Sequence, residues 1–385
     1  MVVRKAVIPV AGFGTRMLPA AKAVPKEMLP VLDRPTIQYV VEEAAAAGAD
    51  DVLLVTSRDK RAVEDHFDRN PELEQRLAAG GKEGLLASLN ELVNRVKIHS
   101  VRQPSQLGLG DAVNQARRHV GGEPFLCLLG DAVFSPPGGN SLRSAAGLQP
   151  GLHELRGRPI GRVLTKMGRV TREQVVEALD HQKRHGGKLG EVLINLGFVS
   201  REDIEFALAA QRGEETAVPT VAAAAPAPAA PLPAQQLVEA FREFGTSVIG
   251  LEEVPPEKVS RYGVVGGRRV RDGVLKLDTL VEKPAPEVAP SRLAIAARYV
   301  LTPAVFACLD ATPPGKGGEV QLTDALRLLL SREPIHGVIL RGVRHDIGNA
   351  VDWLKTNLVF ASRDEPTWRA LRPLLESLLG DDERA

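Results

Sequence analysis

The sequence has little of several features that mark particular classes of protein. Only two of its 385 residues are cysteine, Cys127 and Cys308, and they lie far apart and outside any metal-ligand spacing. A disulfide framework or a cysteine-bound metal is therefore not indicated. Aromatic residues make up 4% of the chain and the formal net charge is +1, so no overall field draws the chain onto nucleic acid or an anionic membrane. Any anionic ligand has to be held by a local site.

Long apolar runs are also missing. The first apolar run, Ala6–Ala11, is broken by Pro9 and followed by Gly12 and Gly14. It is too short for the apolar stretch of a signal peptide and far too short to cross a bilayer. We therefore expect a soluble, cytoplasmic protein that associates with neither nucleic acid nor membrane.

As far as about Asp131, short apolar runs alternate with amphipathic segments of helical length. This alternation is typical of β-α-β units around a parallel sheet. The predicted strands are Ala6–Val10, Val52–Thr56, Val96–His99 and Phe125–Leu129. The predicted helices are Thr36–Ala47, Arg61–Phe67, Gly84–Asn94 and Asp111–His119. The sequence therefore predicts an α/β fold of a nucleotide-binding type.

The pattern ends in a Pro- and Gly-rich loop at residues 135–140, and a helical segment with an internal repeat follows. Leu164 aligns with Leu193, and Val175 aligns with Ile204 at the same offset. Each copy predicts a short helix, a turn at its glycine (Gly168 or Gly197), and a longer helix that begins at Thr171 or Ser200. The sequence thus predicts an inserted, all-helical domain built from two repeats.

The remainder of the chain returns to the first pattern. Prolines among alanines at 213–234 predict a semi-extended linker. A helix at Leu237–Phe244 follows, then strands at Thr246–Gly250, Gly263–Val265, Leu275–Val281 and Arg292–Val300, and a helical tail at Asn349–Leu379. The predicted domains are 1–140, the insertion 155–212, the linker 213–234, and 235–385.

A glycine-rich loop, Val10–Pro19, follows the first predicted strand directly. Glycines let backbone N–H groups approach phosphate oxygens, and Arg16 can neutralise their charge. The alternative is an ordinary tight turn. The third glycine of a dinucleotide-binding loop and the Gly-x-x-x-x-Gly-Lys-[Ser/Thr] loop are both missing, so a nicotinamide enzyme and a P-loop NTPase are not supported. The segment Pro25–Pro30 adds a second cation, Lys26, and a carboxylate, Glu27.

A carboxylate, Asp131, follows the predicted strand Phe125–Leu129. The carboxyl ends of parallel strands are where open α/β sheets bind ligands. Mg²⁺ prefers one or two carboxylates together with phosphate oxygens and water. Asp131 is therefore a candidate metal ligand; the alternative is a cap of a turn or helix.

Four segments in fixed order carry a closer match: Ile8–Ala20, Ala23–Pro30, Val281–Pro284 and Gly318–Asp324. Together they resemble the bacterial UTP–glucose-1-phosphate uridylyltransferases, over nearly all of residues 3–140 and 235–360. The resemblance implies a fold of the nucleotide-diphospho-sugar transferase type, an α/β Rossmann-like mixed sheet with a β-rich sugar-binding portion. Here a small all-helical domain would interrupt it.

The resemblance implies transfer of a uridylyl group from UTP to glucose 1-phosphate, with Mg²⁺ as cofactor. A sugar-phosphate oxygen attacks the α-phosphorus in line, so catalysis consists of positioning and charge neutralisation. Arg16 and Lys26 would hold the β- and γ-phosphates. Lys283 would lie between the sugar phosphate and the α-phosphate; otherwise it is a solvated lysine at a strand end. Asp131 would be a metal ligand and Asp346 its partner.

The resemblance also implies residues that hold the base and the sugar. Gln103 would read the uracil edge, since an amide pairs with both donors and acceptors. The nucleotide-binding residues implied are Ala11, Gly12, Gly14, Thr15, Glu27, Gln103 and Gly108. The sugar-binding residues implied are Gly263, Glu282, Glu319 and Gln321. Each of these residues could otherwise be an ordinary loop residue.

Two departures from the family stand out. Leu107 occupies a position where the family usually has a lysine, so one phosphate or base-loop contact is in doubt. The insertion replaces a short helical connection, and its repeats resemble the N-terminal domain of type II secretion and pilus-extension ATPases, some of which bind cyclic di-GMP. The family's initial arginine is Pro159 in the first copy and Lys188 in the second. The alternative, which the residues favour somewhat, is that the repeat only builds a helical core.

Other functions stay open at this point. An enzyme of the same kind could use dTTP or another sugar 1-phosphate, because a few pocket contacts decide that choice. A nucleotide- or cyclic di-GMP-sensing adaptor is an alternative of another class, although it has no use for Lys283 beside Glu282. We also expect a homo-oligomer of unspecified size.

Overall fold

The computed structural model describes residues 2–136, 159–166, 170, 172–196, 198–199, 201–212 and 231–381. The chain divides into two compact units. Unit 1 comprises Met1–Pro137 and Ala230–Asn357, and unit 2 comprises Gly138–Ala229 and Leu358–Ala385. The domain boundaries given above stay a prediction.

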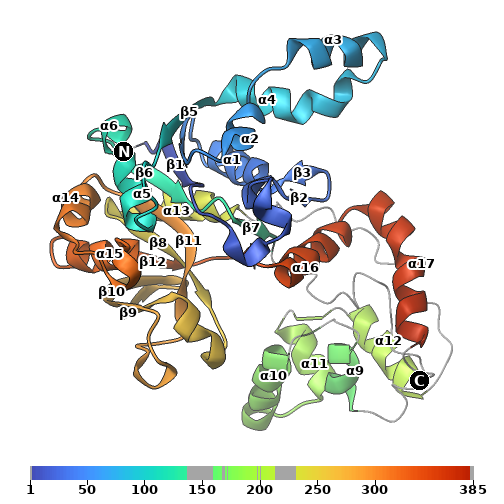
Figure 1. Ribbon diagram of the computed structural model, residues 1–385. Helices are drawn as coiled ribbons and strands as arrows, with labels where there is room; N and C mark the ends of the chain where they lie inside the picture. The colour runs from blue at the N-terminus through green and yellow to red at the C-terminus, as the bar shows by residue number, and fades with distance from the viewer. Residues whose placement is uncertain are drawn as a thin grey trace. The chain divides into compact units, whose positions relative to one another are not determined.

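Unit 1 is built on a nine-stranded mixed sheet (Figure 1) with the order β5-β4-β1-β6-β11-β8-β12-β10-β9. Its strands are β1 (Lys5–Pro9), β4 (Asp51–Thr56), β5 (Lys97–Arg102), β6 (Phe125–Leu128), β8 (Val248–Glu253), β9 (Gly263–Arg271), β10 (Val274–Glu282), β11 (Leu293–Leu301) and β12 (His336–Ile339). The first four strands in that order are parallel, and β11 is antiparallel to both β6 and β8. The predicted α/β, Rossmann-like mixed sheet is confirmed.

The strands in the middle of this sheet are buried on both faces, which explains their unbroken apolar sequences. Along β1, Ala6 and Ile8 enter one hydrophobic core while Val7 enters the other, as the two-residue period of a strand requires. Side chains of β4 and β6 alternate in the same way. Two apolar cores therefore lie on opposite faces of one sheet.

Helices supply the other half of each core (Figure 1). Residues of α1 (Thr36–Ala46) and α13 (Pro233–Phe244) belong to the core that contains Ile8. Residues of α5 (Leu109–Gln115), α14 (Ala304–Ala311) and α15 (Leu322–Leu330) belong to the core that contains Val7. Helix α13 begins with a proline at its first position and ends before Gly245, whose φ of 68° forms a left-handed cap, the usual asymmetry of helix ends.

The structure also contains four short strands outside the nine-stranded sheet and several further helices in the described residues. The short strands are β2 (Pro30–Val31), β3 (Arg34–Pro35), β7 (Ala132–Ser135) and β13 (Val343–Asp346). The other helices are α2 (Arg61–Asp65), α3 (Pro71–Ala79), α4 (Ala87–Arg95), α6 (Arg117–Val120), α16 (Ala350–Ala361) and α17 (Glu365–Asp381). The sequence analysis did not predict β2, β3, β7, β12, β13, α3, α14 or α15, and it expected a loop and no strand between Asp131 and the insertion. Strand β7 follows Asp131 directly and β13 ends with Asp346, and the two strands pair with each other in a separate two-stranded sheet.

The topology of the sheet determines where a ligand can bind. From β1 the chain passes through α1 to β4 and on to β5, then returns to β6 on the other side of β1. Strands β1 and β6 therefore flank a topological switch point, and ligands of open α/β sheets bind at the carboxyl ends of such strands. The glycine loop follows β1 there, and Asp131 follows β6.

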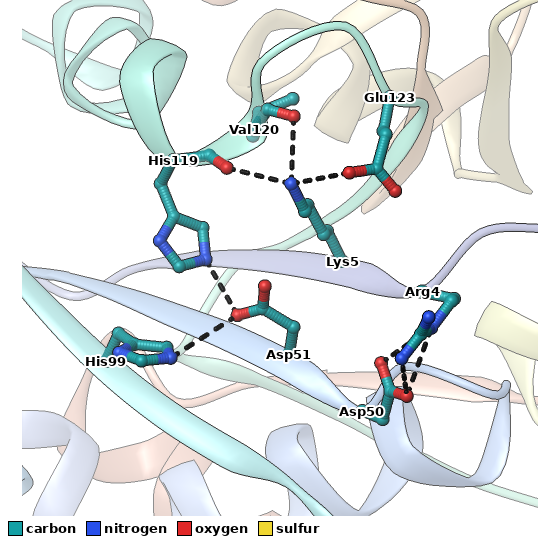
Figure 2. Close-up of polar contacts among 8 residues, drawn as sticks. All are labelled: Arg4, Lys5, Asp50, Asp51, His99, His119, Val120 and Glu123. Carbon is teal, nitrogen blue, oxygen red and sulfur yellow. Dashed lines mark hydrogen bonds and ion pairs between the residues drawn. The ribbon is translucent and has the colours of Figure 1, made fainter.

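Polar side chains tie the amino ends of the same strands together (Figure 2). The Lys5 Nζ donates to the carbonyls of His119 and Val120 at 2.9 and 3.1 Å and lies 2.7 Å from Glu123 Oε1. The Asp51 Oδ1 lies 2.7 Å from His119 Nε2. This network is at the opposite end of β1 from the glycine loop, because Lys5 is the first residue of the strand.

The described part of unit 2 contains the helices of the insertion. They are α9 (Ile160–Lys166), α10 (Arg172–His185), α11 (Leu189–Asn195) and α12 (Arg201–Arg212). Leu164 and Leu193, the aligned leucines of the two copies, lie fully buried in one core. A Cβ on Gly161 would lie 2.9 Å from Val175, and one on Gly190 would lie 3.2 Å from Ile204. These glycines allow close helix packing.

The predicted turns at Gly168 and Gly197 and the predicted helix starts at Thr171 and Ser200 lie outside the described residues. In the part of the chain that is described, no helix combines the length and the apolar character needed to traverse a bilayer.

Candidate active site

The glycine loop after β1 brings Lys26 to the end of the sheet. Gly14 has a φ of 65°, a left-handed conformation that glycine adopts without strain. A Cβ there would lie 3.4 Å from Lys26 Cδ, so the loop and the lysine stem pack closely. Lys26 begins a short 3₁₀ helix, Lys26–Met28.

The ammonium of Lys26 meets the carboxylate of Asp131, with Nζ 2.5 Å from Oδ2. Burial by itself would lower the pKa of Lys26, but the charges of Asp131 and Glu27 outweigh it and the pKa is raised. Burial would likewise raise the pKa of Asp131, but Lys26 holds it below its usual value. Both groups are therefore charged at neutral pH.

Asp346 is brought beside Asp131 by the short ladder between β7 and β13. In the register of that ladder Asp346 lies opposite Ala132, and the Ile347 N–H donates to the Asp131 carbonyl at 2.9 Å. Burial and then the charge of Asp131 raise the pKa of Asp346. Two carboxylates thus share a small volume, and a cation placed between them would relieve their repulsion.

This donor set fits a divalent metal of the magnesium type. In the described residues, no group of three or more His, Cys, Asp or Glu side chains has the arrangement of a metal cage. Mg²⁺ does not need one, because it usually takes one or two protein carboxylates and completes its shell with phosphate oxygens and water. Asp131 and Asp346 are two carboxylates that could serve in this way.

Arg16 lies against the same carboxylates, and Gly348 leaves the room for it. A Cβ on Gly348 would lie 2.8 Å from Asp346 Oδ1 and 3.0 Å from Arg16 Nη2. The positive charges of Arg344 and Arg16 oppose the rise in the pKa of Asp346 that burial and Asp131 cause, but they do not cancel it. Sequence analysis did not identify Gly348, which only the packing reveals.

On the other side of the site, β10 ends with Glu282, and Lys283 follows. The Lys283 Nζ lies 2.9 Å from Glu282 Oε1, and its side chain is 55% exposed. Lys283 has a φ of 45°, and its backbone N–H donates to the Tyr262 carbonyl at 3.0 Å. A positive φ is strained for a residue other than glycine and is common at functional positions.

At Gly263, near this end of the site, the neighbouring side chains leave no room for a Cβ. A Cβ there would lie 2.9 Å from Ile295 Cδ1, 3.0 Å from Thr323 Oγ1 and 3.3 Å from Glu282 Oε2. Any larger residue would displace Glu282 or the wall formed by Ile295.

Seven of the predicted site residues line one cavity of about 630 Å³. It is lined by Arg16, Asp131, Gly263, Glu282, Lys283, Gln321 and Asp346, among others. Lys26 joins this group through Asp131. Four charged residues from distant parts of the chain, Lys26, Asp131, Lys283 and Asp346, are therefore gathered at one place.

The nucleotide-binding candidates lie in two neighbouring places. Ala11, Gly12 and Thr15 line a second cavity of about 500 Å³, together with Lys60. Glu27 lines neither of these two cavities: it is 2% exposed, and Lys60 Nζ lies 2.7 Å from its Oε2. Burial raises the pKa of Glu27 even though Lys60 opposes it.

Gln103 and Gly108 hold the loop after β5. The Gln103 Nε2 donates to the Gly108 carbonyl at 3.1 Å and to Asp111 Oδ2 at 2.7 Å. Gly108 has a φ of 97°, and a Cβ there would lie 2.8 Å from the Val320 carbonyl. The Leu107 carbonyl accepts from the Val320 N–H at 2.7 Å, while the Leu107 side chain is exposed.

Gly108 packs against the loop around Val320, which carries the two remaining sugar-binding candidates, Glu319 and Gln321. Glu319 is exposed, and its Oε2 accepts from Gln321 Nε2 at 3.0 Å. Gln321 lines the larger cavity, whereas Glu319 does not.

Sequence analysis missed Arg344, which also lines the larger cavity. Its Nε donates to Glu252 Oε1 at 2.6 Å, and its Cζ lies 4.6 Å from the centroid of the Tyr262 ring. Arg344 lies two residues before Asp346, and alternate residues of a strand share a face. This spacing would have indicated Arg344 only if β13 had been predicted as a strand, which it was not.

Comparison with known proteins agrees with this geometry. The family model described as nucleotidyl transferase matches residues 5–150 and 231–362.

The chain belongs to the nucleotidyl transferase family.

Two relatives from Bacillus subtilis (strain 168) are named UTP–glucose-1-phosphate uridylyltransferase. YngB is 36% identical over 92% of this chain and 88% of its own length. The other is 34% identical over 99% of each chain. Among solved structures, the UTP-bound UGPase from Acinetobacter baumannii matches with a TM-score of 0.68 and 28% identity, over 98% of this chain and 99% of its own. The resemblance inferred from the four sequence segments is confirmed.

The close fit around Gly348 predicts that Gly348→Ala impairs nucleotidyl transfer. The added methyl group displaces Arg16 or Asp346, and misplacing such groups by about 1 Å can lower turnover about a hundredfold. Both neighbours are ends of flexible side chains, so the protein should stay folded. Steady-state kinetics and thermal melting check this, with Gly122→Ala as the control because a Cβ there meets nothing within 4 Å. Equal activity of the two variants would contradict the placement of Arg16 beside Asp346.

Proposed function

We propose that this chain transfers the uridylyl group of UTP to glucose 1-phosphate and so produces UDP-glucose and pyrophosphate. The observation that carries the proposal is that Asp131, Lys283 and Asp346 line one cavity, while Lys26 is ion-paired to Asp131. The names of the relatives support UTP and glucose 1-phosphate as the substrates. The family description gives the reaction class, which is nucleotidyl transfer.

In this reaction an oxygen of the sugar phosphate forms a bond to the α-phosphorus of UTP. The bond from the α-phosphorus to the bridging oxygen of the β-phosphate breaks, and pyrophosphate leaves with the electron pair. Both reactants are anions, so the protein must offset their repulsion and hold them in line. No covalent enzyme intermediate is needed.

The chain's own cations are placed for these two tasks. Arg16 and Lys26 approach from the glycine loop, on the β1 side of the switch point, and would hold the β- and γ-phosphates. Lys283 approaches from the end of β10 and would hold the sugar phosphate as it meets the α-phosphate. Cations fixed on opposite sides stabilise charge that spreads over the phosphate oxygens in the transition state.

The sugar would lie over Gly263. Glu282 would accept hydrogen bonds from sugar hydroxyl groups, and Gln321 lines the same wall. Ala11, Gly12, Gly14 and Thr15 would offer backbone N–H groups to the nucleotide.

The base would lie toward the loop after β5, where Gln103 and Gly108 are joined by a hydrogen bond. Glu27 would contribute to the nucleotide site indirectly, because it forms an ion pair with Lys60, which lines the same cavity as Ala11 and Gly12.

Members of this family generally use a divalent metal, and we propose that Mg²⁺ serves here. Asp131 and Asp346 would hold it. When bound, the ion neutralises phosphate charge that the lysines do not reach. Asp131 also keeps Lys26 charged, because its own carboxylate is the largest favourable charge near that ammonium.

We expect pyrophosphate release with glucose 1-phosphate to be fastest with UTP in a panel that also contains dTTP, CTP, ATP and GTP. The measurement is initial rate at saturating glucose 1-phosphate and Mg²⁺. Lys283→Ala is the control: turnover with every nucleotide should fall by orders of magnitude while the variant stays folded. Preference for dTTP would replace the substrate assignment with glucose-1-phosphate thymidylyltransferase. Absence of turnover with any nucleotide would leave the nucleotide-sensing adaptor as the better account.

The insertion is proposed to bind cyclic di-GMP only as a second function. Its support is the resemblance of the repeats, while the packing of Gly161 and Gly190 against Val175 and Ile204 is equally explained by a helical core. A homo-oligomer likewise stays a prediction.

Isothermal titration of cyclic di-GMP into the full-length chain tests the second function. Saturable binding that weakens in Lys188→Ala, the position of the family's initial arginine, is the expected result. UTP titrated into the same variant should bind as in the unaltered chain. A titration without heat of binding would reduce the insertion to a structural role.

A further inference from the structure

A buried ion pair lies behind the metal-ligand candidates, outside the cavity they line. Arg298 is 0% exposed and Glu43 is 5% exposed. The Arg298 Nη2 lies 2.7 Å from Glu43 Oε2, and Nε lies 3.0 Å from Oε1. This is the two-bond arrangement that arginine makes best with a carboxylate.

The rest of the Arg298 guanidinium donates to the backbone on both sides of Asp131. Its Nη2 lies 2.8 Å from the Ala132 carbonyl, and its Nη1 lies 3.4 Å from the Leu129 carbonyl. The residue after Asp131 and the residue two before it are therefore bound to one rigid, planar group. The Phe134 ring, with its centroid 4.8 Å from Cζ, covers the guanidinium.

The backbone of β11 is distorted at this point. The register of β11 against β8 shifts between Ile295 and Tyr299, and Ala297 has a φ of 58°. The Ala297 carbonyl accepts from the Leu129 N–H at 3.1 Å and from Arg298 Nη1 at 3.1 Å. A strained conformation in a strand persists only where its surroundings hold it, and here Arg298 and the Asp131 loop do so.

Glu43 connects the pair to the points where the insertion joins unit 1. Its Oε1 accepts from the Ala234 N–H at 2.9 Å, at the start of α13, where the chain returns from the insertion. The chain leaves for the insertion through β7, which begins at Ala132. The first residue of the last strand before the insertion and the start of the helix after it are thus both hydrogen-bonded to this one ion pair.

We propose that Glu43 and Arg298 are a positioning pair that holds Asp131 in place for the divalent metal and connects it to the start of α13, where the chain returns from the insertion. This inference rests on the proposed function of the site. Stability alone is a weak explanation for the pair, because a buried ion pair gains little over apolar residues of the same volume. In contrast, loss of a group that orients a metal ligand from behind typically lowers metal affinity or activity by about 10- to 100-fold.

The test compares Mn²⁺ binding by electron paramagnetic resonance, with and without UTP, and turnover in the full-length chain and in Arg298→Lys. The lysine keeps a charge against Glu43 but lacks the planar fork that reaches both carbonyls. We expect the Mn²⁺ dissociation constant to rise and kcat to fall, each by about 10- to 100-fold, as is usual when a group behind a metal ligand is lost. The KM for glucose 1-phosphate should change little.

The matched control is Lys5→Met at the other end of β1 (Figure 2). Lys5 also donates to two backbone carbonyls and meets a carboxylate, that of Glu123. This variant should lose stability and keep both Mn²⁺ binding and kcat. The double variant Glu43→Gln, Arg298→Met leaves no stranded charge and should reproduce the Mn²⁺ defect of Arg298→Lys.

Unchanged Mn²⁺ binding and kcat in Arg298→Lys, or losses equal to those of Lys5→Met, would overturn the inference. Failure of both Arg298 variants to fold would do the same, because the pair would then serve the fold and not the metal. If the unaltered chain makes no UDP-glucose, the proposed function fails, and the Mn²⁺ comparison still decides this inference.

Discussion

Asp131 and Asp346 lie side by side at the carboxyl end of a parallel sheet, and their mutual repulsion governs the charges around them. Burial and the charge of Asp131 raise the pKa of Asp346, while Lys26 lowers the pKa of Asp131. Two neighbouring carboxylates in a partly buried place need compensating cations. Lys26 and Arg16 supply part of that charge, and in the proposed reaction a divalent metal would supply the rest. The repulsion that is unfavourable in the protein alone would then favour metal binding between the two carboxylates.

The fold makes this arrangement through connections that are short in space and long in sequence. The switch point places the loops after β1 and β6 together, and the β7–β13 ladder then adds Asp346 from more than two hundred residues away. The insertion interrupts the chain between these partners. In sequence, it begins after β7 and ends before α13, and the first residue of β7 and the start of α13 are both hydrogen-bonded to the Glu43–Arg298 pair. The two segments of the scaffold that flank the insertion in sequence are therefore held by one buried ion pair.

The sequence predicted those parts of the molecule in which neighbouring residues share one environment. Strands β1, β4 and β6 are buried on both faces, so their apolar runs are unmistakable, and the glycine loop and Asp131 follow them directly. Strand β13, with half-buried Val343 and Asp346, has no such run. Arg344 was missed with it. The Glu43–Arg298 pair joins residues 255 positions apart, and neither residue has a local signal because a buried charge is defined only by its distant partner.

The position of the bound metal ion tests the proposed site. Crystals of the full-length chain grown with Mn²⁺ and UTP, measured at the manganese absorption edge, would locate the ion by its anomalous scattering. We expect a peak in coordination contact with the carboxylates of Asp131 and Asp346 and with UTP phosphate oxygens. A peak that neither carboxylate contacts, with UTP bound elsewhere than between the glycine loop and Lys283, would contradict it.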